Sequence, residues 1–414
     1  MNQASKCGII RTFWGLVDMD RPKMDRPKYE IYVRDRNLQR IGVISQFSNL
    51  ELTMNYNDVG GWIIDMPDTK DSGADFLKTV RAQGGGLGGI VVQRNGVPIF
   101  SGPIHGLEAT ANYQGDQTSE NISFWGSDDN GLLFSRLAMP PTPLGTYQAW
   151  AGTGIDYDEY INVPAETCLV ELVENNCINS PPRKINGLVT TSDQGRGNVI
   201  TLRARYQNLI EKLQEAATAG RLGFRTIQKT PGQIVFEVYE PANKTDTVIF
   251  SREFGNLTSY RYKVEKPEAN FVIVGGGGED VARNFRYAGD EPSRSLYGTW
   301  EIFVDQRQTT DVAELNQALY KTLQEKTEKI EVEIQPYGNS PVRYPDHYDL
   351  GDTATVVIGG ERTSDIIRSI KITLTPDKGE VITPTIGTPG VGTTFRLYDN
   401  YRNLEARLIN LETI

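Results

Sequence analysis

The chain has 414 residues, of which 38% are hydrophobic, and this length predicts about two to four domains with cores of ordinary size. Its net charge of −10 argues against an electrostatic grip on nucleic acid, which requires clustered Lys and Arg, although a like-charged wall would let DNA pass without binding it. No apolar run reaches the roughly 18 residues of a transmembrane helix, and the N-terminus lacks the long apolar segment of a signal peptide, so we expect neither.

Residues 1–28 are predicted to be an N-terminal arm. Its apolar side chains could dock on a neighbouring chain: Ile9, Ile10, Phe13, Trp14 and Leu16. The repeated Arg-Pro-Lys of MDRPKMDRPK then favours an extended connector to the first domain.

Residues 29–139 are predicted to form a first β-domain. Alternating or apolar stretches indicate strands at 29–34, 40–47, 49–56, 60–64, 106–112 and 121–125, and residues 128–134 close the domain. One short helix is expected at 72–80, because Phe76, Leu77 and Val80 share a helical face.

The stretch GGIVVQRNGVPIFSGPI, residues 88–104, is typical of a β-hairpin. Two short apolar runs flank Asn95 and Gly96. These are the residue types that accept the positive φ values of a tight primed turn, so we expect the turn at this pair.

Residues 140–297 are predicted to be a middle α+β region that begins with a proline-rich stretch. Its most regular element is a helix over 208–217, whose apolar residues recur every three to four positions and whose end is marked by Gly220. Helical turns are expected at 156–160 and 167–175, a hairpin at 223–239, and strands at 247–250, 257–263 and 269–275.

Residues 298–386 are predicted to form a second β-domain. A strand at 299–304 leads into a helix over 312–327, and a further strand follows at 329–335. The last part contains a second hairpin at 354–372, in which Gly359 and Gly360 form the turn. Two such hairpins near the two ends of the chain indicate a duplicated β-domain.

Residues 387–414 are predicted to be a linker and a C-terminal coiled-coil helix. Apolar residues alternate at spacings of three and four through this segment: Leu397, Tyr401, Leu404, Leu408 and Leu411. This heptad pattern favours a short coiled coil, and a helix that packs back on its own domain is the alternative.

No motif in the chain indicates catalysis, a cofactor or a metal. The glycine runs at 84–89 and 275–278 lack the Gly-Lys-Ser/Thr of a phosphate loop and favour tight bends. The acidic segments at 127–131 and 344–352, the second with His347, match no calcium or zinc spacing. The second histidine, His105, directly follows a predicted strand.

The three cysteines are Cys7, Cys168 and Cys177. Cys168 and Cys177 are expected in one loop, where they could pair, but free thiols fit an odd number of cysteines without metal spacing better.

Four stretches resemble the hub, or minor tail, proteins at the tail tip of long-tailed bacteriophages, and the resemblance covers residues 29–386. They are YEIYVRDRNLQRIGVISQFSNLELTMNYNDVGGWIIDMP, IVVQRNGVPIFSGPI, FGNLTSYRYKVEKPEANFVIVGGGGE and DLGDTATVVIGGERTSDIIRSIKITLTPDKGEVITPTIG. The resemblance implies a mainly β protein with some α, in which two tube-like β-barrel or sandwich domains are separated by an α+β insertion.

The same resemblance implies a homotrimer without an active site. Three chains with two tube-like domains each would form a ring of near six-fold symmetry around the DNA exit channel, assembled in the host cytoplasm and located in the virion. The tail tube or an adapter would lie above this ring and a tip, spike or fibre protein below it. In this interpretation Trp62, Trp125 and Trp300 are core residues.

A second hypothesis is a tail-associated cell-wall hydrolase or a carbohydrate-binding tail protein. It would require a carboxylate pair in a cleft or a row of exposed aromatic residues, and no suitable pair is evident in the sequence.

Overall fold

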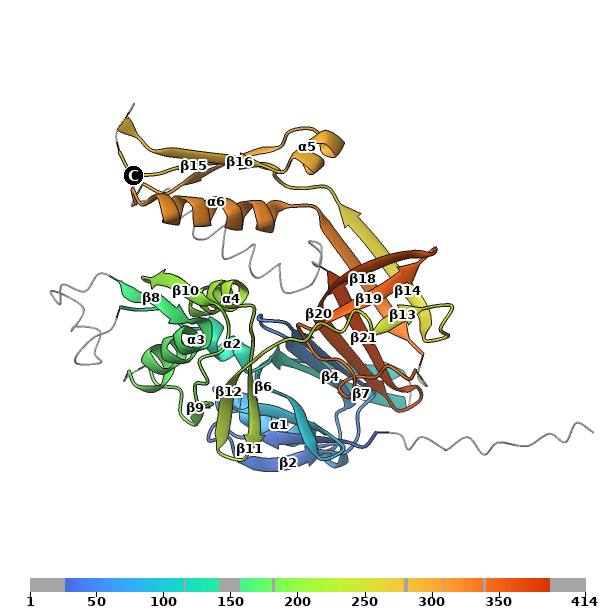
Figure 1. Ribbon diagram of the computed structural model, residues 1–414. Coiled ribbons are helices and arrows are strands. Elements are labelled where there is room, and N and C mark those ends of the chain that lie inside the picture. Colours follow the sequence, from blue (N-terminus) through green and yellow to red (C-terminus); the bar gives the residue numbers. More distant parts are fainter. Residues whose placement is uncertain are drawn as a thin grey trace, which may run out of the picture.

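The structure, a computed structural model, describes residues 27–114, 117–140, 157–180, 183–278, 282–307, 309–337 and 340–387. Strands predominate, as the sequence predicted. Figure 1 shows a β-rich body formed by the two ends of the described chain, a middle unit with the helices α3 and α4, and a small unit that contains α5 and α6. The predicted C-terminal helix and residues 1–26 of the predicted arm lie outside the described residues.

The first strand set comes from the N-terminal part of the chain. Its strands are β1 (Tyr29–Arg34), β2 (Arg40–Ile44), β3 (Asn49–Asn55), β4 (Gly61–Pro67), β5 (Gly89–Arg94), β6 (Val97–Gln114) and β7 (Gln117–Ser127). A turn of 3₁₀ helix, η1 (Lys70–Ser72), leads into α1 (Ala74–Ala82), which buries Leu77 and Val80 against the sheet. The ring of Phe76 also lies against the sheet, over Gly42 of β2, but 40% of this residue stays exposed.

The second strand set comes from the C-terminal part of the chain. Its strands are β13 (Ile249–Ser251), β14 (Leu257–Glu265), β18 (Lys329–Pro336), β19 (Thr353–Ile358), β20 (Glu361–Thr375) and β21 (Gly379–Gly387). Between β14 and β18 the chain leaves the sheet to form the small unit, whereas the corresponding strands β3 and β4 are joined directly by a short turn.

The two strand sets pair in the same order. The hydrogen-bonded order is β3-β4-β7-β6-β5-β1 in the first set and β14-β18-β21-β20-β19-β13 in the second. Corresponding strands also follow one another in the same order along the chain. The sets differ at one end. There β1 pairs antiparallel with both β5 and β2, whereas β13 pairs with β19 in parallel and has no counterpart of β2 among the described strands.

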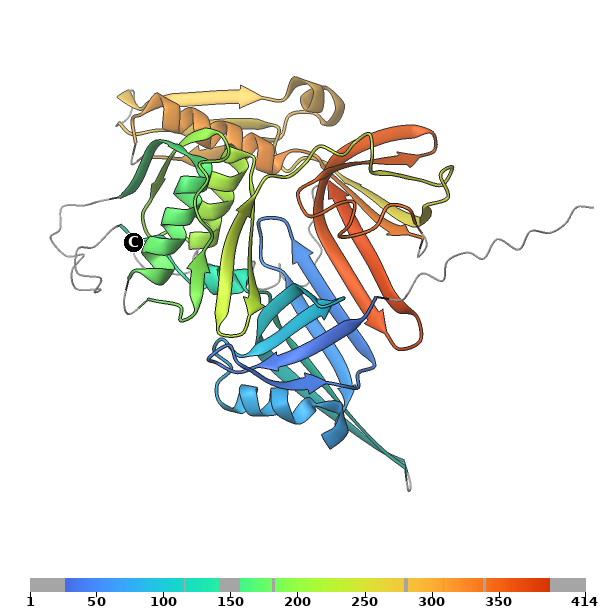
Figure 2. The same cartoon turned by 60° about the horizontal axis from the view of Figure 1, so that its bottom comes forward.

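Each set contains a long strand that follows a tight turn. The first part of β6 pairs with β5 and the rest with β7, while β20 pairs first with β19 and then with β21. The register shifts directly after Ile104 in β6 and directly after Ile367 in β20, so these two residues occupy corresponding places. Figure 2 shows the two long hairpins, β6–β7 and β20–β21, extending toward the same side of the body.

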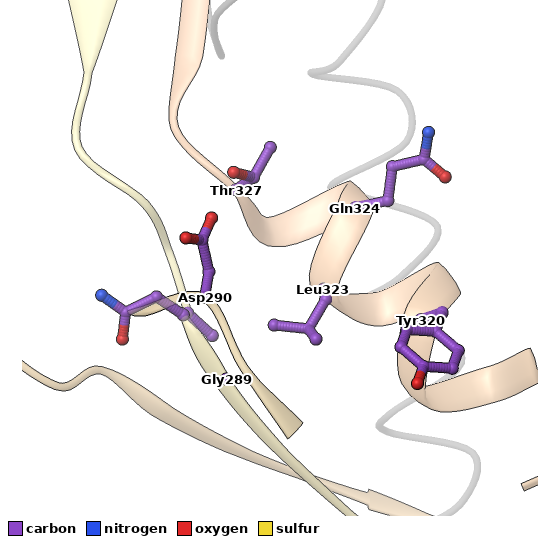
Figure 3. Close-up of a pocket in the computed structure, with 8 residues that line it drawn as sticks. Gly289, Asp290, Tyr320, Leu323, Gln324 and Thr327 are labelled. Carbon is purple, nitrogen blue, oxygen red and sulfur yellow. The ribbon is translucent and has the colours of Figure 1, made fainter. Parts of the chain in front are cut away.

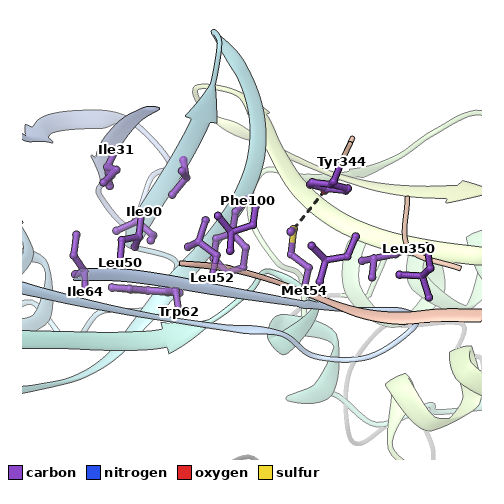
Figure 4. Packing of buried hydrophobic residues seen from close by; sticks show 14 of the residues in the cluster. Ile31, Leu50, Leu52, Met54, Trp62, Ile64, Ile90, Phe100, Tyr344 and Leu350 are labelled. Carbon is purple, nitrogen blue, oxygen red and sulfur yellow. Dashed lines mark hydrogen bonds between the residues drawn. The ribbon is translucent and has the colours of Figure 1, made fainter. Parts of the chain in front are cut away.

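A pairing of β20 with β3 joins the two sets into one continuous sheet of 13 strands. Leu50 and Leu52 of β3 and Ile370 and Ile372 of β20 are fully buried in one core that crosses this contact. Figure 4 shows part of that core. Tyr344 also reaches across, donating its hydroxyl to Met54 Sδ at 3.7 Å (Figure 4).

The middle unit has its own apolar core between two helices and short sheets. Its elements are α2 (Asn130–Phe134), β8 (Asp158–Pro164), α3 (Ala165–Val173), the π-helical turn η3 (Glu174–Ile178), β9 (Leu188–Thr190), β10 (Val199–Ala204), α4 (Leu209–Gly220), β11 (Gly223–Thr230) and β12 (Gln233–Tyr239). The side chain of Asn208 caps α4 by accepting the N–H of Ile210. The expected helical turn at 156–160 is wrong, because alternating residues from Asp158 onward pair as β8 with β10.

The small unit packs a three-stranded sheet on one face of α6 (Val312–Lys326). Its other elements are β15 (Phe271–Gly275), β16 (Phe285–Gly289), α5 (Glu291–Tyr297) and β17 (Glu301–Asp305). Leu315 and Leu319 are buried at the predicted spacing of four, and Asp311 caps α6 by accepting the N–H of Ala313. The boundary expected near residue 297 falls between α5 and β17, within this unit.

Candidate assembly surfaces

A buried ion pair ties the first strand set to the middle unit. Arg34 of β1 donates two hydrogen bonds to the Asp129 carboxylate at 2.5 and 2.9 Å, and both side chains are fully buried. Ser101 donates its hydroxyl to the same carboxylate, and Gln228 of β11 accepts from Arg34 and donates its backbone N–H to Ser101. Because hydrogen bonds compensate the buried charges, we call these four residues the polar joint and assign them a structural role.

Asp128 lies beside the polar joint and is itself buried. Burial raises the pKa of this carboxyl well above its usual range, and the nearby Asp129 and Asp58 act in the same direction. The N–H of Gly60, which donates to Asp128 Oδ2 at 2.9 Å, opposes this shift. The acidic segment at 127–131 thus connects β7 to α2 and supports the joint.

The acidic segment at 344–352 forms a closed turn. Asp352 accepts the backbone N–H of Asp349, and Asp349 in turn pairs with Arg225 of β11 at 2.9 Å. His347 Nδ1 accepts the backbone N–H of Arg343. These contacts link the second strand set to the middle unit, and no group of three His, Cys, Asp or Glu side chains within the described ranges is placed to hold a metal.

His105 lies at the register shift of β6, and its Nε2 is 3.3 Å from Oγ of the buried Ser127. A serine nucleophile would also need an acidic group that orients the histidine. In the described part of the chain no carboxylate hydrogen-bonds to His105, so this pair has the geometry of a side-chain contact across the β6–β7 ladder.

Cys168 and Cys177 are buried thiols in helical segments, α3 and η3, and not in one loop as expected. Burial raises the pKa of the Cys177 thiol to about 12, which disfavours the reactive thiolate.

A pocket of about 350 Å³ lies in the small unit between α6 and the ends of β15 and β16 (Figure 3). Two polar side chains on its wall already have structural partners. Asp290 caps α5 by accepting the N–H of Ser293, and Asn270 bridges the backbone of Gly298 and Trp300. The side chains of Asp290 and Asn270 are therefore engaged in holding the local backbone, and neither is assigned a catalytic role.

The contact between β20 and β3 carries one ion pair on the polar face of the sheet. Lys371 Nζ lies 2.8 Å from Glu51 Oε2, and both side chains are partly exposed. On the opposite face, the buried residues of both strands belong to the shared core. We call this contact the internal junction.

β14 is an outer edge of the continuous sheet, because among the described strands it pairs with β18 only. Aromatic or apolar side chains alternate with charged ones along β14, as in a strand with one buried face, but here the aromatic and apolar side chains are open to solvent. Tyr260 and Tyr262 are 52% and 51% exposed, and Val264 follows at 42%. An uncovered apolar row on an edge strand is a surface suited to strand addition.

The second part of β6 has a similar open side. Residues 104–114 pair with β7, and within the described ranges no strand pairs with their other side. Residues 107–111 are exposed, among them Leu107, Ala109 and Ala111 on one face. The corresponding residues of β20, Ile370 and Ile372, are buried in the internal junction.

The turn residues singled out from the sequence lie at the tips of two hairpins. Asn95 and Gly96 join β5 to β6, Gly359 and Gly360 join β19 to β20, and all four have positive φ. The coiled-coil residues Leu397, Tyr401, Leu404, Leu408 and Leu411 lie outside the described residues.

Trp62 is buried, as expected, but Trp125 and Trp300 are 38% and 41% exposed, so their assignment to a core was wrong. Sequence reasoning also missed the open row on β14. The alternation of Tyr260, Arg261, Tyr262 and Lys263 was a usable signal, because it is the pattern of a strand that buries one of its faces.

No helix in the described part of the chain is long and apolar enough to span a membrane.

A model of the family described as Siphovirus ReqiPepy6 Gp37-like protein matches residues 30–388. The structure is similar to the 43 kDa tail protein of prophage MuSo2 from Shewanella oneidensis, with 13% identity, a TM-score of 0.54, and coverage of 87% of this chain and 98% of that one. It is also similar to a tail protein from Neisseria meningitidis MC58 (11% identity, TM-score 0.51, coverage 88% and 98%). No curated protein matches the sequence. These findings confirm the resemblance to phage tail proteins at the level of family and fold.

Proposed function

This chain belongs to the Siphovirus ReqiPepy6 Gp37-like family, and we propose that it is a structural hub protein of a phage tail tip that assembles as a homotrimeric ring around the DNA exit channel. The observation that carries this proposal is the repeated strand order within one chain. Three chains with two corresponding strand sets each would supply six similar units, which would match a six-fold tube above.

The internal junction supports a ring in particular. It joins two corresponding sets side by side, with β20 of one set against β3 of the other, and it leaves one open edge at each end: the β14 edge and the second part of β6. A contact between two different surfaces of identical chains generates a ring when its rotation closes. If the internal geometry repeats between three chains and its rotation closes, the result would be a closed sheet with alternating first and second sets.

The polar face of the continuous sheet suits the wall of a DNA channel. It presents Glu51, Glu108 and Glu333 together with Arg261 and Lys371. Mixed charges on a chain with a net charge of −10 give DNA no continuous basic surface to bind. The ring would thus guide DNA past its wall without holding it.

The proposed location is the virion, after assembly in the host cytoplasm. A tail-tube or adapter protein would contact one side of the ring, and a tip, spike or receptor-binding fibre protein the other. The predicted helix with Leu404 and Leu408 would extend the contact as a three-stranded coil or would dock a fibre.

Mass measurement of the purified full-length chain by light scattering tests the proposal. We expect a particle of three times 46.2 kDa. The double variant Leu404→Asp with Leu408→Asp separates the two contacts, because it disrupts the predicted coil and should leave a ring-mediated trimer in place. A strict monomer that degrades peptidoglycan would overturn the proposal in favour of a tail-associated hydrolase.

A further inference from the structure

The two open edges of the chain fit each other, and we propose that residues 107–111 of β6 pair antiparallel with β14 of a second copy, in the same register as the internal junction. This inference rests on the proposed trimeric ring and specifies how its subunits meet. It assigns an occupant to each edge, and that occupant is another copy of this chain.

The register on β6 follows from the shared register shifts. Ile104 and Ile367 precede the shift in their strands. In both strands the next residue is skipped in the pairing, and regular pairing then continues. Ala109 is five residues after Ile104 and Ile372 is five residues after Ile367, so Ala109 corresponds to Ile372.

The register on β14 follows from rows of paired residues that cross each sheet. In the first set the row runs through Ile104, Gly126, Trp62 and Leu52. In the second it runs through Ile367, Ile386, Val332 and Tyr262. Tyr262 therefore occupies the place of Leu52. Since Ile372 lies opposite Leu52 across the internal junction, Ala109 should lie opposite Tyr262 of the second copy.

Side-chain sizes are complementary in this register. The internal junction pairs two branched side chains of similar size, Ile372 with Leu52. The proposed contact pairs a small residue with a large one, Ala109 with Tyr262 and Ala111 with Tyr260. Directly opposite side chains on one face of a sheet lie close enough for such a pair to fill the space between strands. The exposed tyrosine row would thus be covered by a strand that leaves room for it.

Charges are also complementary, with the signs exchanged. In the internal junction Lys371 of β20 pairs with Glu51 of β3. The corresponding residues of the proposed contact are Glu108 of β6 and Arg261 of β14, and Lys263 lies directly opposite Glu108 as Thr53 lies opposite Lys371. Glu108 would then meet two cationic side chains of the second copy.

The cation lies on β20 in the internal junction but on β14 in the proposed contact, and this difference disfavours pairings between two sets of the same kind. If β20 of one chain met β14 of another, Lys371 would face Arg261 and Lys263. If β6 met β3, Glu108 would face Glu51. Like charges in register are destabilising, so the arrangement selects the alternation of first and second sets around a ring.

Cysteine cross-linking of the full-length chain tests the register. In a Cys7→Ser background, the variant with Ala109→Cys and Tyr262→Cys should give covalent dimers and trimers on a denaturing gel after mild oxidation. The matched control carries Thr110→Cys and Tyr262→Cys, which the register places on opposite faces of the sheet. It should give at most about a tenth of that cross-linked product, because the two thiols cannot meet within the geometry of a disulfide.

Charge reversal tests the ion pair independently. Glu108→Lys should raise the dissociation constant of the trimer about ten-fold or more, and adding Arg261→Glu and Lys263→Glu should restore it. Glu120→Lys is the matched control, because it makes the same charge change on the exposed part of β7 and should leave assembly unchanged.

The outcomes separate this inference from the function on which it rests. A trimer that cross-links at 109 and 262 and responds to Glu108→Lys supports both. A trimer by mass that cross-links only in the control, or that tolerates Glu108→Lys unchanged, overturns this contact and leaves the ring. A wild-type chain that is monomeric at all concentrations removes the ring and this contact together.

Discussion

β3 and β14 hold corresponding places in the two strand sets but have opposite surroundings. Leu50 and Leu52 of β3 are fully buried, whereas the corresponding Tyr260 and Tyr262 of β14 are half-exposed. The difference arises because β20 covers β3 within the chain, while β14 ends the sheet. The comparison shows that β14 keeps the alternation of a strand with a buried face although one side of it is unpaired in the described chain, and in our proposal a second copy supplies the missing strand.

The joints to the middle unit differ in the same way. The first strand set holds that unit through the fully buried pair Arg34–Asp129. The second set uses Arg225 and Asp349, whose side chains are 41% and 33% exposed. One joint thus excludes water and the other does not, and this difference predicts unequal responses to mutation.

The largest effect is expected at the polar joint. Arg34→Ala leaves the Asp129 carboxylate buried without its cation, which should lower the free energy of unfolding by about 3–5 kcal/mol. Asp349→Ala at the exposed joint should cost about 1 kcal/mol or less. Urea denaturation at fixed protein concentration compares the two variants, and equal losses would show that the joints do not differ as their burial implies.

The next effect compares the two corresponding strands directly. Leu52→Ala empties a buried site and should destabilise the chain by about 2–5 kcal/mol. Tyr262→Ala should change the stability of the isolated subunit by less than about 0.5 kcal/mol, because its side chain is open to solvent there. The same Tyr262 variant should weaken the trimer in sedimentation experiments. A Tyr262 variant that assembles like the wild type would remove β14 from the contact.

A pH effect is expected at Asp128, which lies beside the polar joint. Because burial raises the pKa of Asp128, folding favours its protonated form. Its contribution to stability is therefore complete below the unfolded pKa of about 4 and is lost as the pH rises toward the higher folded pKa. Asp128→Asn should flatten this decline in melting temperature. An unchanged pH profile in the Asp128 variant would contradict the burial argument.

The smallest effect is expected at the ion pair of the internal junction. Lys371→Ala should cost less than about 1 kcal/mol, because the pair is partly exposed and screened. Lys371→Glu should cost more, since it places a second carboxylate beside Glu51. High salt should reduce the difference between these two variants in denaturation midpoint, and salt-independent values would argue against an electrostatic origin.

Local patterns predicted most of the elements and little of their arrangement. The tight turns at Asn95-Gly96 and Gly359-Gly360 depend on residue type, and the helices α4 and α6 depend on the spacing of apolar residues. Turns and helices of this kind could therefore be predicted from the sequence. The separation of β14 from β18 by the small unit was not readable, because strand partners more than 60 residues apart leave no local signal. For the same reason the sequence indicated a duplication without showing that β20 and β3 join its halves.

Residues with polar partners were equally hard to assign. Asp129 belongs to an acidic segment for which the sequence indicated only that it matches no calcium or zinc spacing, and its partner Arg34 is 95 residues away. The coiled-coil prediction for Leu397, Tyr401, Leu404, Leu408 and Leu411 stays a prediction, since these residues lie outside the described ranges.

Electron-microscope images of the purified, full-length oligomer test the central claim most directly. We expect class averages with a three-fold ring, a central lumen and six similar lobes formed by alternating first and second strand sets. Compact particles without a lumen, or rings whose symmetry is not three-fold, would contradict the account.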